Sequence, residues 1–498
     1  MSTITGLTSN AMINAQQLVR MQQQLNDLSM QMSTGKTAQT YGGLGINTGL
    51  AVNTSGQISA LNSYLNSISI VNTRIQLQNS ALDQLNTISQ QTQAAMFSPQ
   101  NFTLVSNGQT SGQIQANSNF DEALNLLNTQ AGNTYLFSGN ATGTPATTTP
   151  DSILNGDALA AGLKQVISER LQADQGADGR GRLDPPSVAG TAVTLAEDGV
   201  TPFGFKLAGA TTNIAGATVT GPVGSPPSLT IDLGGTNPSE GTTVNIQLTL
   251  PDGTSTSINL TATSTVPPPN GSFAIGATAA DTAANLATAI DTQVQNLAQT
   301  DLVGASAIAA SNNFFDLPAQ RVDGPPFDTA TSLRNATATD TVQWYTGDNG
   351  AGDPRSTMSA TVDNGITVNY GVRANEQALR NVVQNLATLA AVSFSPSDPN
   401  ASAAYNALSQ RIGANLTPSA TAQQISSIQT ELAGANDTAS TAQTSINAKI
   451  PILQNVLSGI ENADPNLVGS ELLALQTQMQ GSLQITSTLS KLSLVNFM

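Results

Sequence analysis

The stretch LVRMQQQLNDLSMQM (residues 18–32) decides how the chain begins, because its apolar side chains recur at alternating steps of three and four. These positions are Leu18, Met21, Leu25, Leu28 and Met32. Such heptad-like spacing predicts an amphipathic helix whose narrow apolar stripe packs against another helix. The stretch that follows, residues 33–49, holds five glycines and therefore predicts a loop.

A second stripe predicts a longer helix from about residue 55 to residue 96. Its apolar positions are Ile58, Leu61, Leu65, Ile68, Ile75, Leu82, Leu85 and Ile88. Asn72 and Asn79 occupy two positions of the same seam, where polar residues weaken a coiled coil but fix its register. A third helix is expected from residue 111 to about residue 129.

The C-terminal end repeats the pattern. One stripe comprises Ile425, Ile428, Leu432, Ile446, Ile450, Leu453, Leu457 and Ile460, and a last helix is expected after Asp464–Pro465, with Val468, Leu472, Leu475 and Met479 on its apolar face. Pro451 predicts a kink or a boundary, because proline inside a helix costs about 3 kcal/mol. Long helices are thus expected at both chain ends.

The middle of the chain differs in composition. From about residue 145 to residue 370 it is rich in Thr, Gly and Pro, and its strand-like runs alternate in polarity. Asp252–Gly253 separates two such runs, and Asn364–Gly365 separates two more, so each dipeptide predicts a hairpin turn. Helices are expected over residues 281–298 and 375–392.

Composition excludes several classes of function. Only 10% of the residues are charged, and 16 basic against 32 acidic residues give a net charge of -16, which disfavours nucleic acid and anionic membranes as partners. The sequence holds no Cys and no His, so it lacks the commonest metal ligands and the commonest general base. We expect no enzyme, no cofactor and no metal site. The first residues lack a secretory signal, which leaves a cytoplasmic chain or export without cleavage.

Two motifs imitate ligand sites and fail. Ser33–Thr37 (STGKT) resembles the end of a phosphate-binding loop, but Met30 stands where the first glycine belongs, so a turn between helices is the better interpretation. Asp174, Asp178 and Asp184 suggest a calcium loop, but Pro185 occupies the position of its bidentate Glu. We interpret that segment as a solvated turn.

With both ends described in this way, the sequence resembles the bacterial flagellin superfamily, and more closely its hook-associated junction protein of the FlgL type, which joins hook to filament. The first helix and its small-residue turn (18–45) carry part of the resemblance. Four further segments carry the rest: AGNTYLFSGN (131–140), WYTGDNG (344–350), GIENADPNLVGSELLALQTQM (459–479, with Asn462 and Pro465 as departures) and the terminus GSLQITSTLSKLSLVNFM (481–498).

The resemblance implies a non-catalytic structural subunit of the extracellular flagellum, located at the hook–filament junction and exported by the flagellar type III apparatus. Its implied partners are copies of itself, the neighbouring hook-associated protein, filament flagellin and an export chaperone. Assembly would proceed through the terminal helices, and the expected contact residues are Leu18, Met21, Leu25, Leu28, Leu472, Leu475, Met479 and Leu483.

The expected fold class is α+β, with an elongated, coiled-coil-like helical bundle from both chain ends and an inserted β-rich middle. Five segments are expected: an assembly helix with its loop (1–50), rod helices (51–140), a β-rich outer region (141–340), a hairpin and helix returning to the core (341–420), and C-terminal rod and assembly helices (421–498).

Two alternatives stay open. The region 141–340 is longer than expected for a junction protein, which keeps a filament flagellin as the second interpretation. A secreted adhesin or tip protein, with the helices as a stalk, is the third.

Overall fold

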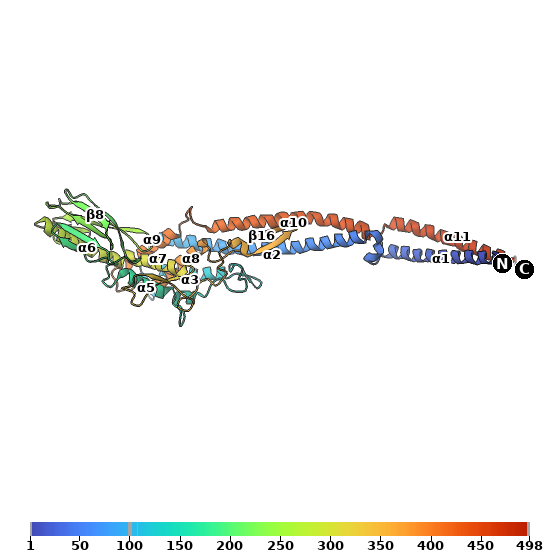
Figure 1. The fold of residues 1–498 in the computed structure, drawn as a ribbon, viewed down its shortest axis with the longest axis horizontal. Helices are drawn as coiled ribbons and strands as arrows, with labels where there is room; N and C mark the ends of the chain where they lie inside the picture. Colours follow the sequence, from blue (N-terminus) through green and yellow to red (C-terminus); the bar gives the residue numbers. More distant parts are fainter. Residues whose placement is uncertain (1, 98–101, 107, 496–498) are drawn as a thin grey trace. The chain divides into compact units, whose positions relative to one another are not determined.

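The computed structural model describes residues 2–97, 102–106 and 108–495 (Figure 1). The chain forms two compact units, each built from separated stretches of sequence. We call Met1–Asn72, Ala360–Val368 and Asn436–Met498 the terminal unit, and Thr73–Ser359 with Asn369–Ala435 the middle unit. The chain therefore leaves the terminal unit twice and returns to it twice.

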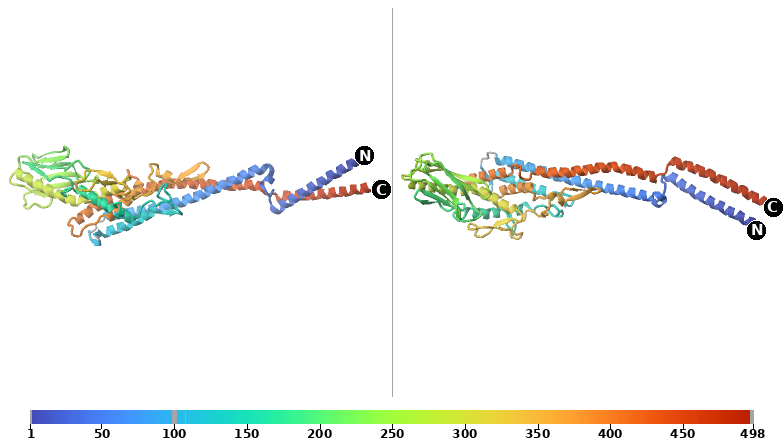
Figure 2. Two further views of the ribbon diagram at one scale, coloured as in Figure 1. Left: turned by 60° about the horizontal axis from the view of Figure 1, so that its bottom comes forward. Right: turned by 45° about the horizontal axis from the view of Figure 1, so that its top comes forward.

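The terminal unit is almost entirely helical. It contains α1 (Ser2–Thr34), the 3-10 helix η1 (Tyr41–Asn47), the first half of α2 (Thr48–Phe97), the hairpin of β15 (Ser359–Asp363) and β16 (Ile366–Asn369), most of α10 (Ile425–Glu461), and α11 (Pro465–Val495). Within this unit α1 lies beside α11 and α2 beside α10, in every view of Figures 1 and 2. Helix α2 begins seven residues before the position predicted from the apolar stripe (48 against 55).

Both seams agree with the predicted periodicity. Ile68, Val71 and Ile75 of α2 are buried, as are Ala439, Ala442 and Ile446 of α10. Asn72 and Asn79 each hold a buried Oδ1 without a hydrogen-bond partner, as expected of polar residues in an apolar seam. A kink or a boundary was predicted at Pro451, and the boundary is wrong, because α10 continues through Pro451 to Glu461. Residue Asn447, whose carbonyl loses its donor there, is exposed to water.

The middle unit combines helices with short strands. Its helices are α3 (Ser111–Leu127), α4 (Pro150–Asn155), α5 (Leu163–Gln175), α6 (Ala279–Gln299), α7 (Asp301–Phe315), the 3-10 helix η2 (Pro354–Thr357), α8 (Gln377–Ala391) and α9 (Ala401–Asn415). Its strands are β1 (Leu104–Ser106), β2 (Gln109–Thr110), β3 (Gln130–Ala131), β4 (Thr134–Tyr135), β5 (Ser187–Ala189), β6 (Ala192–Ala196), β7 (Lys206–Thr212), β8 (Thr218–Val223), β9 (Ser228–Asp232), β10 (Thr243–Thr249), β11 (Ser255–Thr263), β12 (Ser272–Ala274), β13 (Gln320–Val322) and β14 (Leu333–Asn335).

Two four-stranded sheets supply most of the β structure, with orders β12-β11-β10-β7 and β5-β6-β9-β8. The predicted turn at Asp252–Gly253 joins β10 to β11, which pair antiparallel with Asn245 opposite Asn259. Helix α6 begins in a capping box made by Thr278 and Asp281, and its apolar face joins the core shared with both sheets. Long terminal helices and a β-rich middle confirm the predicted α+β class.

Candidate assembly interface

The predicted stripe of α1 faces a partner within the same chain. Leu18, Met21, Leu25 and Leu28 are all half-buried, and α1 contacts α11. The two helices come so close that a Cβ atom placed on Gly469 would lie 3.4 Å from Met32 Cε. The end of the Met32 side chain, which is 49% exposed, therefore reaches α11 at Gly469.

The predicted residues of α11 divide into two groups. Leu475 is buried, and Leu472 and Met479 are half-buried, so these three continue the seam with α1. Leu483 is 52% exposed and does not share that environment. The structure thus gathers seven of the eight predicted contact residues into one intramolecular seam, and their contact with other copies stays a prediction.

A second apolar set on the terminal helices escaped the sequence analysis. These large side chains are 44–71% exposed, and they are Met12, Ile13, Val19 and Met30 on α1 and Leu467, Leu473, Leu483 and Ile485 on α11. All of them except Leu483, which the sequence analysis names, lie off the three-and-four spacing of the main stripe, so the search for a stripe missed them. Their signal in the sequence is apolar residues on the helix face where Gln and Asn otherwise predominate. Such exposed apolar surface is typical of an interface.

Residues 35–37, which follow α1, contact residues 461–463, which lie between α10 and α11. Thr37 N donates to Glu461 O over 2.7 Å, Ala463 N donates to Gly35 O over 3.0 Å, and Lys36 Nζ lies 3.1 Å from Glu461 Oε2. Gly35 ends α1 with φ at +67°, a conformation that favours glycine. The segment that imitates a phosphate loop is therefore a structural turn, as predicted, and its lysine is occupied by an ion pair.

Two segments that carry the family resemblance meet in the middle unit. Asp348 N donates to Ser138 O over 2.8 Å, and Ala374 N donates to Phe137 O over 2.8 Å. Arg373 Nη2 donates to Asp348 Oδ2 over 3.0 Å. Burial raises the pKa of the Tyr345 phenol, whose hydroxyl donates to Asp348 O over 3.0 Å. Residues 131–140 and 344–350 thus form one packed joint, although about 200 residues separate them.

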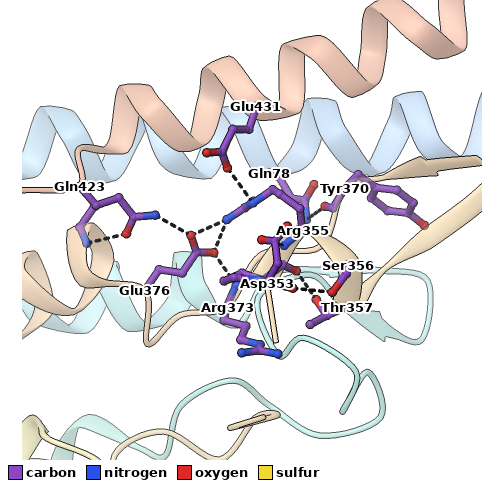
Figure 3. Close-up of polar contacts among 12 residues, drawn as sticks. Gln78, Asp353, Arg355, Ser356, Thr357, Tyr370, Arg373, Glu376, Gln423 and Glu431 are labelled. Atoms are coloured by element: carbon purple, nitrogen blue, oxygen red, sulfur yellow. Dashed lines mark hydrogen bonds and ion pairs between the residues drawn. The ribbon is translucent and has the colours of Figure 1, made fainter. Parts of the chain in front are cut away.

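A buried ionic cluster anchors the chain where it returns from this joint (Figure 3). Glu376, at the start of α8, accepts hydrogen bonds from Arg355 Nη2, from Arg373 N over 3.0 Å and from Gln423 Nε2 over 2.9 Å. Arg355 also lies 3.0 Å from Glu431 of α10. Gln78 of α2 donates to Leu136 O and Tyr370 O over 3.1 and 3.3 Å. The cluster holds η2, α8, α10 and α2 of the middle unit together.

The segment that imitates a calcium loop is not the solvated turn expected from the sequence. Asp174 is fully buried at the end of α5, where Arg170 Nε donates to it over 2.8 Å and Gly204 N over 2.9 Å. Burial raises the pKa of its carboxyl, against the opposing effect of Arg170. The prediction failed at Asp174 because this carboxylate is paired inside the protein, whereas Asp178 and Asp184 are exposed as expected.

The two chain ends match known families. Residues 7–142 match the bacterial flagellin N-terminal helical region, and residues 419–498 match the bacterial flagellin C-terminal helical region. The chain carries both terminal helical regions of a flagellin. These matches support membership in the bacterial flagellin superfamily. No curated protein sequence matches the chain significantly.

The flagellin regions coincide with the elements described above. The N-terminal region covers most of α1 and all of η1, α2, α3 and the segment 131–140. The C-terminal region covers α10 and α11. Flagellin-type proteins are structural subunits of the extracellular part of the bacterial flagellum and assemble with other flagellin-type subunits. The two matches therefore support a structural flagellar subunit that assembles with other flagellin-type subunits.

The described part of the chain shows few features of a ligand-binding site. An open cleft of about 610 Å³ lies among α7, α8 and α9. Amide side chains are the commonest kind in its lining, and its two arginines are paired, Arg411 with Asp252 over 2.9 Å and Arg380 with Asp316 over 3.0 Å. Within residues 2–97, 102–106 and 108–495, no group of three acidic side chains could hold a metal ion. No helix in that part of the chain is long and apolar enough to cross a membrane.

Proposed function

We propose that the protein is the hook–filament junction subunit of a bacterial flagellum and acts without catalysis or a cofactor. The observation that supports this choice is the packed joint between residues 131–140 and 344–350. These two segments, like the terminus 481–498, resemble the junction type rather than flagellins in general, and a backbone hydrogen bond from Asp348 N to Ser138 O joins them. A resemblance carried by two contacting segments is stronger than one carried by either segment alone.

The junction role assigns partners to the two ends of the assembly. One neighbour would be a hook-associated protein and the other the filament flagellin, and an export chaperone would hold the chain before type III export. The exposed apolar side chains on α1 and α11 supply surface for such contacts, since charged groups are depleted at interface cores. The absence of Cys and His from the whole sequence argues against the usual nucleophile and base pairs.

Localisation in intact flagella tests the proposal. A label on an exposed loop of the middle unit, imaged by electron microscopy, should mark a short band at the end of the hook. Labelling along the whole filament would overturn the junction role and would favour a filament flagellin, which the length of residues 141–340 also suits. Absence of the protein from purified flagella would overturn both roles.

A further inference from the structure

The helix break carries a large apolar side chain that contacts nothing. Ile46 lies in η1 and is 100% exposed, although Leu44, two residues before it, lines a cavity. A single exposed apolar residue needs no explanation, but other apolar residues near Ile46 are exposed as well. Around the break, exposures of 42–63% are found for Tyr41, Leu50, Val52, Ile452, Val456 and Leu467.

The cavity beside Ile46 can receive a side chain. Its volume is about 310 Å³, and its lining includes the apolar residues Ala38, Tyr41 and Leu44. The two charged residues that line it, Lys36 and Glu461, form an ion pair with each other. Thr34, Gln39 and Thr40 complete the lining, so the cavity offers apolar surface beside hydroxyl and amide groups and has no unpaired charge to attract an ionic group.

We propose that Ile46 of one copy inserts into this cavity of a neighbouring copy. The projecting side chain and the cavity are two different patches of one chain. Contacts between different patches are head-to-tail, and they generate rings or helical arrays where identical patches would close a dimer. This inference rests on the proposed function, because it names a contact within the assembly of flagellin-type subunits.

The choice of a second copy as occupant follows from the two patches being present together. Each copy brings both a projecting aliphatic group and a cavity lined by Leu44 and Ala38. In a row of copies, each Ile46 would therefore fill the cavity of the next copy. A partner protein of another kind would have to supply its own apolar group, and Ile46 would then stay in water. The position of Ile46 in the assembly therefore separates the two cases.

Thiol accessibility tests the burial of Ile46. The natural sequence has no cysteine, so Ile46→Cys introduces a sole thiol. Maleimide should label it rapidly in the free subunit and at least about tenfold more slowly in isolated flagella. Leu159→Cys is the matched control, because Leu159 is 87% exposed and lies in the middle unit, and it should react equally in both states. Equal reactivity of Ile46→Cys in both states would overturn the inference.

Cross-linking tests the occupant. In flagella made from Ile46→Cys/Ala38→Cys chains, mild oxidation should yield dimers and longer ladders on a denaturing gel, because a disulfide needs Cβ atoms within about 4.5 Å. Each single variant should give no ladder. Protection of Ile46→Cys without a ladder of copies, or adducts to other flagellar subunits alone, would contradict a second copy as occupant.

A third variant separates this inference from the proposed function. Ile46→Asn should reduce incorporation into flagella at least about tenfold, and Ile46→Val should restore it nearly to the natural level. If the natural chain itself never enters flagella, the proposed function fails. If the natural chain enters and Ile46→Asn enters equally well, the inference about Ile46 fails alone.

Discussion

Charged side chains are few in this protein, and many of them are paired inside the middle unit. Arg170, Arg321, Arg355 and Arg373 are all buried, and each has a carboxylate partner. Buried pairs add little net stability, but breaking one leaves an uncompensated charge in the core. Such pairs fix how distant segments meet, which matters for a chain whose surfaces are mostly amide and hydroxyl.

Asp340 should make stability depend on pH. Burial acts to raise its pKa, but hydrogen bonds from Thr337 N, the Thr341 hydroxyl and Arg334 outweigh this effect and lower the pKa to about 2. An unfolded Asp titrates near pH 3.9, so the contribution is complete above about pH 4 and is lost as pH falls towards 2. We expect Asp340→Asn to lower the free energy of unfolding at pH 7 by about 1–2 kcal/mol, after allowance for solvent screening.

Urea denaturation at several pH values would measure this effect. The deficit of Asp340→Asn should shrink steadily below about pH 4. Asp316→Asn serves as the control, because the Asp316–Arg380 pair is largely exposed and its loss should change stability by less than about 1 kcal/mol. A deficit of constant size from pH 7 to pH 2 would contradict the assigned cause.

At the scale of elements, the sequence pattern predicted the helices and hairpins that have a local signal. It missed the elements whose burial depends on contacts with distant parts of the chain. The stripes located α1, α2, α10 and α11, and turn dipeptides located both hairpins. Helix α7 was not predicted, because its sequence DLVGASAIAASNNFF is apolar on nearly all sides and has no stripe. Its burial against α5 and α9 becomes visible only in the fold. Most of the exposed apolar residues of α1 and α11 were missed for a related reason, because the exposure of a side chain depends on where the partner helix lies.

Pro451 gives a prediction for one element. Since α10 runs through it, Pro451→Ala should restore a helical hydrogen bond and remove a steric clash, raising the free energy of unfolding by about 1–3 kcal/mol. Pro465→Ala is the matched control, because Pro465 is the first residue of α11, where proline is tolerated. Thermal unfolding followed by circular dichroism would compare them. Equal shifts for both variants would refute the explanation.

At the scale of the whole molecule, the proposed function depends on two separate apolar surfaces of the terminal helices. One apolar face of α1 and α11 is occupied within the chain, and a second set of apolar residues remains exposed for contacts with other subunits. Of the eight residues predicted as assembly contacts, seven lie on the first face, whereas the exposure of Leu483 places it with the second set. The family matches explain why both ends were recognisable, because residues 7–142 and 419–498 lie in the flagellin regions and residues 143–418 do not.

Two neighbouring leucines of α11 should separate these roles. Leu475 is 8% exposed and Leu473 is 65% exposed. Leu475→Asn should destabilise the pairing of α1 with α11 by about 2–4 kcal/mol, whereas Leu473→Asn should leave the helix content of the free chain unchanged and reduce incorporation into flagella. Circular dichroism and quantification in purified flagella would measure the two effects. Identical behaviour of the two variants would show that the faces are not distinct.

The tie between Lys36 and Glu461 joins residues 425 positions apart. During synthesis, α1 therefore emerges from the ribosome long before α11 does, and the terminal unit stays incomplete until α11 has been made. A chain interrupted before α11 leaves α1 without its intramolecular partner, so a truncated copy would lack one side of the seam that the terminal unit needs.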